Sequence, residues 1–120
     1  MRYGAPVMRY GKWVEAKEDY IEDFYPAFPI GSAGHVVNRR VAQYFVDHQE
    51  SLRNYQGEDV SVGIWLSQTN FYEEVKMKNS PFFENNGQCQ NREKFIVGHN
   101  MNRAKLLKCY EDDLKEDASE

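Results

Sequence analysis

Apolar positions in the middle of the chain repeat at helical spacing. Val41 begins a mostly apolar set whose later members follow at offsets of 3, 4, 7 and 11, on one face of a helix. The side-chain oxygen of Asn38 can accept a backbone N–H and cap this helix. A second helix is predicted over residues 59–68, and its acidic start suits the positive end of the helix dipole.

Strand patterns flank these helices. Residues 71–77 alternate between apolar and polar positions, which predicts a half-buried strand. Residues 33–37 and 95–97 each predict a further short strand, the latter buried. The order of helices and strands predicts a mixed α/β fold.

The remaining segments are predicted to be irregular or helical. Residues 1–30 contain several Gly and Pro breakers, with short extended pieces, and residues 80–92 predict a loop with an Asn-Gly turn. The acidic run 15–23 predicts a solvated loop or a short helical turn. A last helix is predicted over 102–114, with its inward face given by Ala104, Leu107 and Leu114.

Length and composition indicate one folded domain. The chain has 120 residues, of which 41% are hydrophobic and 14% aromatic, and such a composition argues against disorder. No apolar run approaches the roughly 20 residues that span a bilayer, and the first residues lack a signal-peptide pattern.

Charge is concentrated at one end. The net charge is −4, and residues 111–120 hold six acids and one Lys, so residues 1–110 are close to neutral. Without a basic patch to neutralise phosphates, we expect no nucleic-acid partner. We expect the acidic tail 111–120 to be the solvated end of the last helix, fraying into disorder.

Two cysteines leave two alternatives open. Cys89 and Cys109 are too few for a disulfide scaffold or a structural zinc site. They could form one disulfide in an oxidising compartment or stay as two free thiols.

Candidate chemistry gathers around glycines and a carboxylate pair. Gly31 and Gly34 would let the backbone approach a ligand, because no Cβ intervenes. Glu58 and Asp59 open a helix after Gly57, a suitable place for a general base. The plainer alternative is that the glycines make a turn and Asp59 caps the helix. His99 follows a predicted strand, where ligands bind in α/β folds, and is the best metal-ligand candidate.

Several short motifs follow one another in a characteristic order and spacing. They are Lys12-Trp13-Val14, Tyr25-Pro26, the Gly31 and Gly34 pair, Gly34-His35-Val36-Val37-Asn38, Glu58-Asp59-Val60-Ser61-Val62-Gly63 and Val97-Gly98-His99-Asn100. This ensemble resembles the second half of a β-1,3-galactosyltransferase / N-acetylglucosaminyltransferase domain, and the similarity extends over about residues 9–110.

The resemblance implies the acceptor-side (C-terminal) half of a GT-A type transferase, with a mixed sheet flanked by helices over residues 1–110. Such enzymes move a sugar from a UDP-sugar to a glycan hydroxyl with inversion, forming a β-1,3 link in protein glycosylation. They use a divalent metal, usually manganese (Mn2+), and lie on the lumenal side of the Golgi membrane. They are held there by an N-terminal membrane helix, which would be this chain's only route to a membrane.

Site roles follow from the same resemblance. Asp59 matches the base that takes the proton from the acceptor hydroxyl, and Glu58 matches an orienting or acceptor-binding neighbour. His99 matches a late metal ligand. Trp13 and Tyr25 could stack on sugar rings, and ordinary core packing is the alternative for both. Gly31 and Gly34 would admit the sugar to the backbone.

The chain also departs from the family pattern. His35 and Asn38 replace the family's Tyr and Ser, and there is no Asp-x-Asp metal motif. We therefore expect a C-terminal fragment or degenerate copy that lacks the donor half and is poorly active alone. A non-catalytic carbohydrate-binding or partner module is the alternative, and an unrelated small α/β domain is a third possibility. The transferase hypothesis predicts that Asp59, His99 and the 31–34 loop converge on one cleft.

Overall fold

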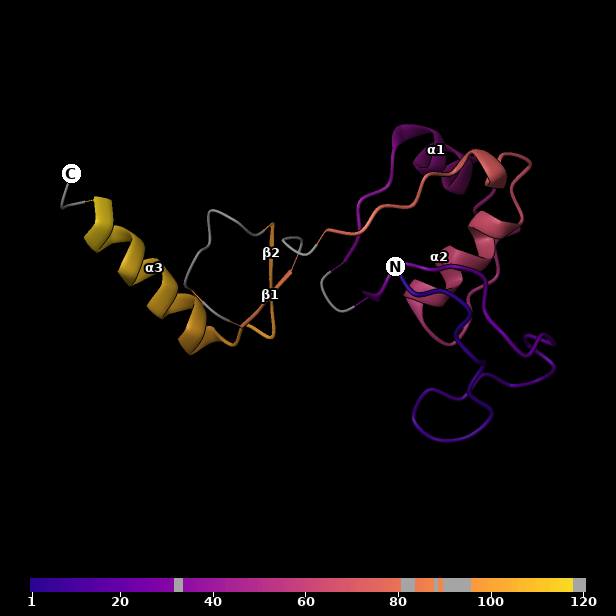
Figure 1. Cartoon of the computed structure of the whole chain (residues 1–120), viewed down its shortest axis with the longest axis horizontal. Coiled ribbons are helices and arrows are strands. Elements are labelled where there is room, and N and C mark those ends of the chain that lie inside the picture. Colours follow the sequence, from indigo (N-terminus) through magenta and orange to yellow (C-terminus); the bar gives the residue numbers. More distant parts are fainter. Residues whose placement is uncertain (32–33, 81–83, 88, 90–95, 118–120) are drawn as a thin grey trace. The chain divides into compact units, whose positions relative to one another are not determined.

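The computed structural model describes residues 1–31, 34–80, 84–87, 89 and 96–117. The chain divides into two compact units, Met1–Lys78 and Asn79–Glu120, within the range that the sequence predicts as one domain. The first unit contains α1 (Arg39–Asp47), α2 (Glu58–Ser67) and the 3-10 helix η2 (Tyr72–Glu74). The second contains β1 (Glu84–Asn86), β2 (Val97–His99) and α3 (Arg103–Asp117) (Figure 1).

The start of α1 is confirmed in detail. The Val41 N–H donates to Oδ1 of Asn38 over 3.0 Å, so Asn38 is the N-cap that the sequence predicts. The helix ends at Asp47, before the apolar pattern does, and the N–H of His48 donates to the Tyr44 carbonyl over 3.1 Å.

Helix α2 is the central element of the first unit. It is confirmed close to its predicted bounds, with Gly57 as N-cap. Its buried residues point in more than one direction, because apolar clusters pack on two of its faces. They are Val60, Ser61, Val62, Gly63, Ile64 and Leu66.

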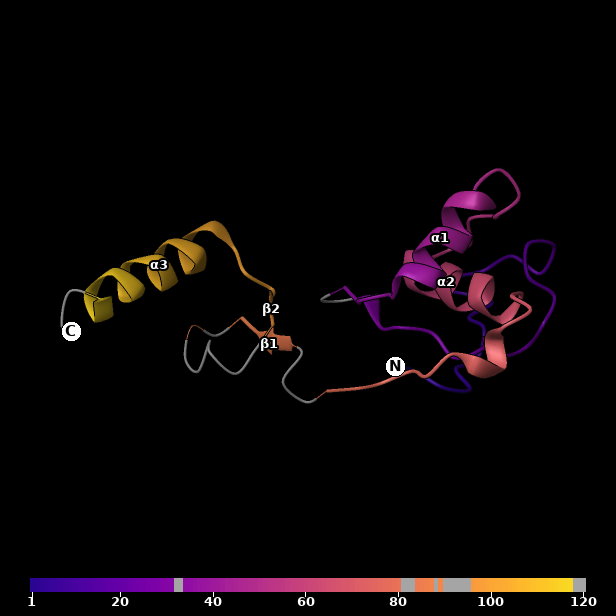
Figure 2. The ribbon, with the colours of Figure 1, turned by 90° about the horizontal axis from the view of Figure 1, so that it is seen from above.

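Two apolar clusters meet on α2. Val60 and Ile64 pack with the N-terminal segment in a first cluster, whose other buried members are Ala5, Val7, Tyr25 and Phe28. Val62 and Leu66 pack in a second cluster with Val41 of α1 and with Phe71. The second cluster explains why α1 and α2 lie side by side in both views (Figures 1 and 2).

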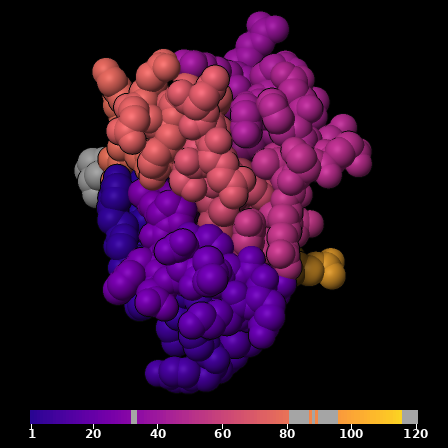
Figure 3. All heavy atoms as spheres, turned by 90° about the vertical axis from the view of Figure 1, so that its right-hand side faces the viewer, coloured from indigo at the N-terminus to yellow at the C-terminus, as the bar shows by residue number. Residues whose placement is uncertain are grey.

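The N-terminal segment forms a loose antiparallel pairing that the sequence does not predict. Isolated bridges join Arg2 to Phe28 and Pro6 to Phe24. The Val7 N–H donates to the Asp23 carbonyl over 2.8 Å. In Figure 3 the indigo and violet N-terminal part of the chain packs against the later, pink part of the same unit.

Two predicted strands of this unit are wrong. Residues 71–77 form η2 followed by irregular chain, and residues 34–37 are not in a strand. Residue 33 lies outside the described part. Val75 and Met77 pack against the second cluster, so the alternation of 71–77 reflects a segment lying across a core rather than strand pairing. Val36 is 81% exposed.

The second unit holds a two-stranded parallel sheet, in which Glu84 pairs with Val97 and Asn86 with His99. β1 lies where the sequence predicts a loop, because its residues are polar and carry no strand pattern. Residue 95 lies outside the described part, and the strand begins at Val97, two residues later than expected. Ile96 is 71% exposed, so a buried strand there is wrong. Among the described residues the sheet is parallel, not mixed.

Helix α3 is confirmed, and it continues to Asp117 through most of the acidic tail. Residues 118–120 lie outside the described part. The predicted inward face is wrong: Ala104 is exposed, and Leu107 and Leu114 are each 51% exposed. Cys109 is instead the buried position among the described side chains of the second unit. No helix of the described residues is both long and apolar enough to cross a membrane.

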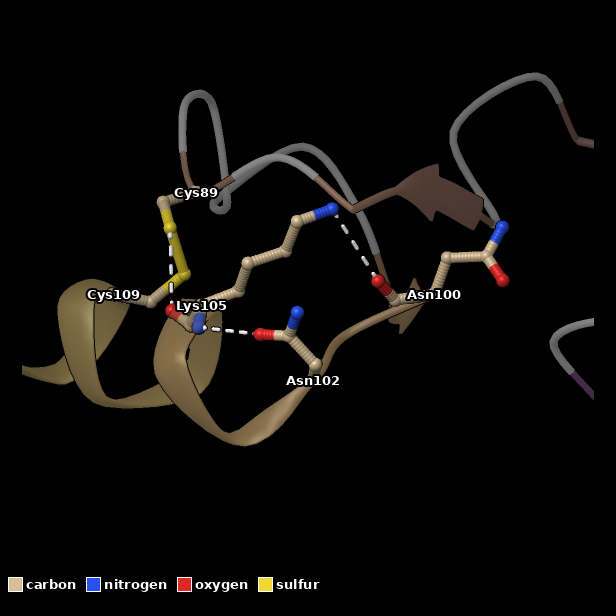
Figure 4. Close-up of a disulfide and its surroundings, with 5 residues drawn as sticks. All are labelled: Cys89, Asn100, Asn102, Lys105 and Cys109. Carbon is tan, nitrogen blue, oxygen red and sulfur yellow. Dashed lines mark hydrogen bonds between the residues drawn. A yellow bond between two sulfur atoms is a disulfide. The ribbon is translucent and has the colours of Figure 1, made fainter.

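A disulfide joins α3 to the segment after β1. Cys89 and Cys109 are bonded, with their Cα atoms 5.2 Å apart, which decides between the two cysteine alternatives (Figure 4). Asn102 caps the helix, since its Oδ1 accepts the Lys105 N–H over 2.9 Å. The Lys105 Nζ donates to the carbonyl of Asn100 over 3.5 Å.

Candidate carboxylate site at the start of α2

The fold brings Gly31 against the two carboxylates that open α2. The Gly31 N–H donates to Oδ2 of Asp59 over 3.2 Å, and Oδ1 of Asp59 accepts from Val60 N–H over 2.8 Å. A Cβ on residue 31 would lie 2.7 Å from Oε1 of Glu58 and 3.2 Å from Cβ of Asp59. A side chain at residue 31 would therefore displace the exposed end of Glu58 and crowd Asp59, whereas glycine leaves both carboxylates in place. Of the predicted site residues, these three are brought together.

The turn before α2 is held by hydrogen bonds on its successive backbone groups. Ser61, 2% exposed, accepts the Tyr55 N–H at its Oγ over 3.0 Å and donates from it to the Gly57 carbonyl over 2.7 Å. The N–H of Gln56 donates to Oε2 of Glu15 over 2.8 Å. The turn that leads into Glu58 and Asp59 is thus bonded both to α2, through Ser61, and to the N-terminal segment, through Glu15.

Glu15 is a buried member of this site that the sequence analysis missed. It is 3% exposed, so its assignment to a solvated acidic run is wrong. The Tyr25 hydroxyl donates to its Oε2 over 3.5 Å. Burial, reinforced by the nearby Glu15 charge, raises the pKa of Tyr25 to about 12. No local signal in the sequence marks Glu15, because the apolar residues before it, Trp13 and Val14, are themselves exposed.

The two predicted aromatic contacts differ in exposure. Trp13 is 58% exposed, and the Nζ of Lys12 lies 4.5 Å from its ring centroid. Tyr25 is 8% exposed, and its ring centroid lies 5.4 Å from that of Tyr20 and 5.9 Å from that of Phe28. The structure favours the core-packing alternative for Tyr25, whereas the Trp13 ring is accessible to a ligand.

Gly34 closes the turn that Gly31 opens. Its N–H donates to the Gly31 carbonyl over 3.3 Å, and its φ of +80° lies in the region that favours glycine. No heavy atom lies within 4 Å of the position that a Cβ would take, so the space beside Gly34 is open. Residues 32 and 33 lie outside the described part.

Several curated proteins are similar in sequence to about half of this chain. A UDP-GalNAc:β-1,3-N-acetylgalactosaminyltransferase 2 from Xenopus tropicalis is 46% identical over 61 residues, which is 51% of this chain and 12% of that protein. The human protein of the same name is 43% identical over 61 residues, with the same shares. An Arabidopsis thaliana hydroxyproline O-galactosyltransferase, GALT5, is 38% identical over 68 residues, which is 55% of this chain and 10% of that protein.

The chain carries a β-1,3-glycosyltransferase-like segment. It spans about 12% of the length of the N-acetylgalactosaminyltransferases that it matches. No protein-family model matches the chain. No solved structure matches it either.

The predicted metal ligand, His99, lies in the second unit of the chain. His99 ends β2, whereas Asp59 belongs to the first unit, so their convergence on one cleft stays a prediction. Within the described ranges, no three His, Cys, Asp or Glu side chains gather closely enough to hold a metal ion. The described residues do not form a manganese site by themselves.

A hollow of about 510 Å³ lies along α1 of the glycosyltransferase-like chain rather than at Asp59. Stacked rings of Tyr44 and His48, 4.1 Å apart, form part of its wall. Its lining residues are Arg39, Arg40, Gln43, Tyr44, Asp47 and His48, so it includes neither carboxylate at the start of α2.

Proposed function

We propose that this chain forms the acceptor-side half of a GT-A type hexosyltransferase. It would move a sugar from a UDP-sugar to a glycan or glycoprotein hydroxyl with inversion, forming a β-1,3 link. The transferase names of the relatives support the reaction class. The observation that carries the proposal is the close approach of Gly31 to Glu58 and Asp59. The resemblance assigns these three residues to the acceptor site.

In this proposal Asp59 is the general base. The acceptor oxygen attacks the anomeric carbon, the bond from that carbon to the UDP oxygen breaks, and UDP leaves with the electron pair. The hydroxyl proton passes to the Asp59 carboxylate. Each of its oxygens accepts one backbone N–H, and each has a further lone pair for the acceptor. The two N–H donors orient the carboxylate before the acceptor arrives.

Neighbouring groups would bind and orient the acceptor. Glu58 is exposed beside Gly31 and would accept hydrogen bonds from sugar hydroxyls. The open space at Gly34 would admit the sugar close to the backbone. Trp13 offers an exposed ring to a C–H face of the sugar. Tyr25 would support the site from the first apolar cluster and would not touch the sugar.

The metal and the compartment remain part of the proposal. His99 would contribute one ligand to Mn2+, and its other ligands would have to come from elsewhere, because the described residues supply no complete site. The Cys89–Cys109 disulfide supports an oxidising compartment such as the Golgi lumen, since cytosolic thiols are kept reduced.

Acceptor binding tests the site without the donor half. The ¹⁵N-labelled chain is titrated with oligosaccharides that end in galactose, N-acetylglucosamine or mannose. We expect the amide signals of Gly31, Gly34 and Asp59 to shift saturably with one of them, and Asp23→Asn, an exposed Asp, to leave the titration unchanged. No saturable shift with any sugar contradicts acceptor binding at this site.

Transfer tests the reaction itself. UDP release is measured with manganese, UDP-sugars and the acceptor that binds, in the longest protein that contains this sequence. Asp59→Asn is expected to lower kcat by at least roughly a hundredfold, the scale of a general base, and to leave acceptor binding in place. Turnover near the wild-type value would remove Asp59 from that role.

A non-catalytic carbohydrate-binding module is the second candidate. Both Asp59 oxygens already accept backbone hydrogen bonds, which is also what a purely structural carboxylate does. This candidate predicts saturable sugar binding, and no UDP release in any protein that contains this sequence.

A further inference from the structure

We infer that Glu15 is a positioning residue, whose buried carboxylate fixes the turn that presents Glu58 and Asp59. The chemical consequence rests on the proposed function, whereas the positioning itself is a property of this fold. The turn is residues 55–57, and the link is the hydrogen bond from Gln56 N–H to Oε2 of Glu15, which joins residues 41 positions apart.

Glu15 is itself held firmly. Its N–H donates to the Met8 carbonyl over 2.8 Å, and its own carbonyl accepts from Nη1 of Arg9 over 3.1 Å. Nη2 of the same Arg9 donates to the Glu22 carbonyl over 2.6 Å. The side chain therefore extends from a braced backbone into the first unit and is not a freely moving surface acid.

Burial makes the bond to Gln56 important. A buried carboxylate is costly unless its oxygens accept hydrogen bonds, and Glu15 is 3% exposed. Oε2 accepts from Gln56 N–H at 2.8 Å and from the more distant Tyr25 hydroxyl at 3.5 Å. Because the acceptor is a carboxylate, the shorter bond belongs to the strong, charge-assisted class.

The other contacts of the turn do not replace this bond. Ser61 holds Tyr55 and Gly57, but Ser61 belongs to α2 and moves with that helix. Glu15 ties the same turn to the N-terminal segment, and Asp59 ties the helix start to Gly31. Without Glu15, the turn keeps the edge-to-face contact of Tyr55 with Tyr20, whose ring centroids lie 5.7 Å apart, but loses the hydrogen bond that fixes its backbone to the N-terminal segment.

The expected consequence is chemical. Asp59 follows Gln56 by three residues, so a shift of the turn moves the carboxylate relative to an acceptor. A misplacement of about 1 Å can cost roughly a hundredfold in rate, even when the altered residue does not touch the substrate. Glu15 would then influence kcat without being a catalytic residue.

The positioning is tested by amide exchange in the ¹⁵N-labelled chain. Glu15→Leu removes the acceptor, and Glu15→Gln keeps a carbonyl oxygen in nearly the same place. We expect the Gln56 amide to exchange at least about tenfold faster in Glu15→Leu, the scale of one charge-assisted hydrogen bond. We expect Glu15→Gln to retain protection within a few-fold, and the Gly31 and Asp59 amide signals to move only in Glu15→Leu.

Matched controls separate positioning from general stability. Glu18→Leu makes the same change at an exposed acid of the same segment and should leave Gln56 protected. Tyr25→Phe removes the other partner of Oε2 and should also leave Gln56 protected. An unchanged Gln56 exchange rate in folded Glu15→Leu overturns the inference. If Glu15→Leu does not fold, the wild-type chain decides: a scalar coupling across the Gln56–Glu15 hydrogen bond supports the inference, and its absence overturns it.

Transfer assays then test the consequence separately. If the full protein transfers sugar, Glu15→Leu should lower kcat by roughly 10- to 100-fold with the donor KM within about twofold, and Glu15→Gln should restore it. If no protein that contains this sequence transfers sugar, the proposed function fails and the exchange experiment still decides the role of Glu15.

Discussion

The two units of this chain are stabilised in different ways. In Met1–Lys78, two apolar clusters share α2, and Ile64 of the first cluster is 2% exposed. In Asn79–Glu120, Cys109 is the buried position among the described side chains, and it is bonded to Cys89. The first unit depends on apolar burial, and the second depends on a covalent link.

This difference affects how the candidate site residues are held. Asp59 and Glu58 begin a helix whose residues are mostly buried, and Glu15 and Ser61 hold the turn before it. His99 ends a strand of three residues in the cross-linked unit. The proposed base and the proposed metal ligand should therefore respond to different perturbations.

The largest expected effect is the loss of core packing in the first unit. Ile64→Ala should lower the free energy of unfolding of that unit by about 2–5 kcal/mol, because it leaves a cavity in the first cluster. Denaturant unfolding followed by Trp65 fluorescence measures this. Val46→Ala is the control, since Val46 is 60% exposed on α1 and its truncation should change little. Equal effects of the two variants would contradict the assigned core.

Reduction should act on the second unit alone. The disulfide closes a loop with a sequence separation of 20, so its removal should cost that unit about 3 kcal/mol. The measurement is a set of ¹⁵N–¹H spectra of the wild-type chain and of the double variant Cys89→Ser, Cys109→Ser. Signals of α3 should move to random-coil positions while those of α2 stay in place. Loss of the α2 signals in parallel would contradict independent stabilisation.

Gly63→Ala should destabilise the first unit by about 1–3 kcal/mol. A Cβ there would lie 2.5 Å from Cβ of Phe28 and 2.9 Å from the carbonyl oxygen of Ala27. The direction of the change in unfolding free energy is decisive, because alanine in a helix interior is otherwise favoured over glycine by about 1 kcal/mol. A stabilised variant in thermal unfolding would show that the 27–28 segment does not pack on α2.

Local signals in the sequence were sufficient for the helices. The side chain of Asn38 and the apolar spacing after Val41 act within one helix, so α1 could be predicted with its cap. The glycine and acidic pair at 57–59 located the start of α2. The approach of Gly31 to that start was predicted only through the family resemblance, because it joins residues distant in sequence.

Features that depend on distant contacts were missed or left open. Glu15 is acidic in an acidic run, and nothing local indicates that its carboxylate meets Gln56. The polar strand Glu84–Asn86 is defined by its partner strand rather than by its own pattern. The pairing of Cys89 with Cys109 required a distance that the sequence does not contain.

The smallest expected effect is confined to alkaline pH and to the first unit. Burial and the neighbouring Glu15 charge raise the pKa of Tyr25 from 10.0 to about 12, whereas the unfolded chain ionises at the ordinary value. The contribution to stability is therefore complete below pH 10 and is lost as the pH rises through about 12. Absorbance at the tyrosinate band gives the titration, and its difference between wild type and Tyr25→Phe should have a midpoint near 12. A midpoint near the ordinary value would place Tyr25 in contact with solvent, where its ring could meet a sugar, and would exclude the core packing assigned to it.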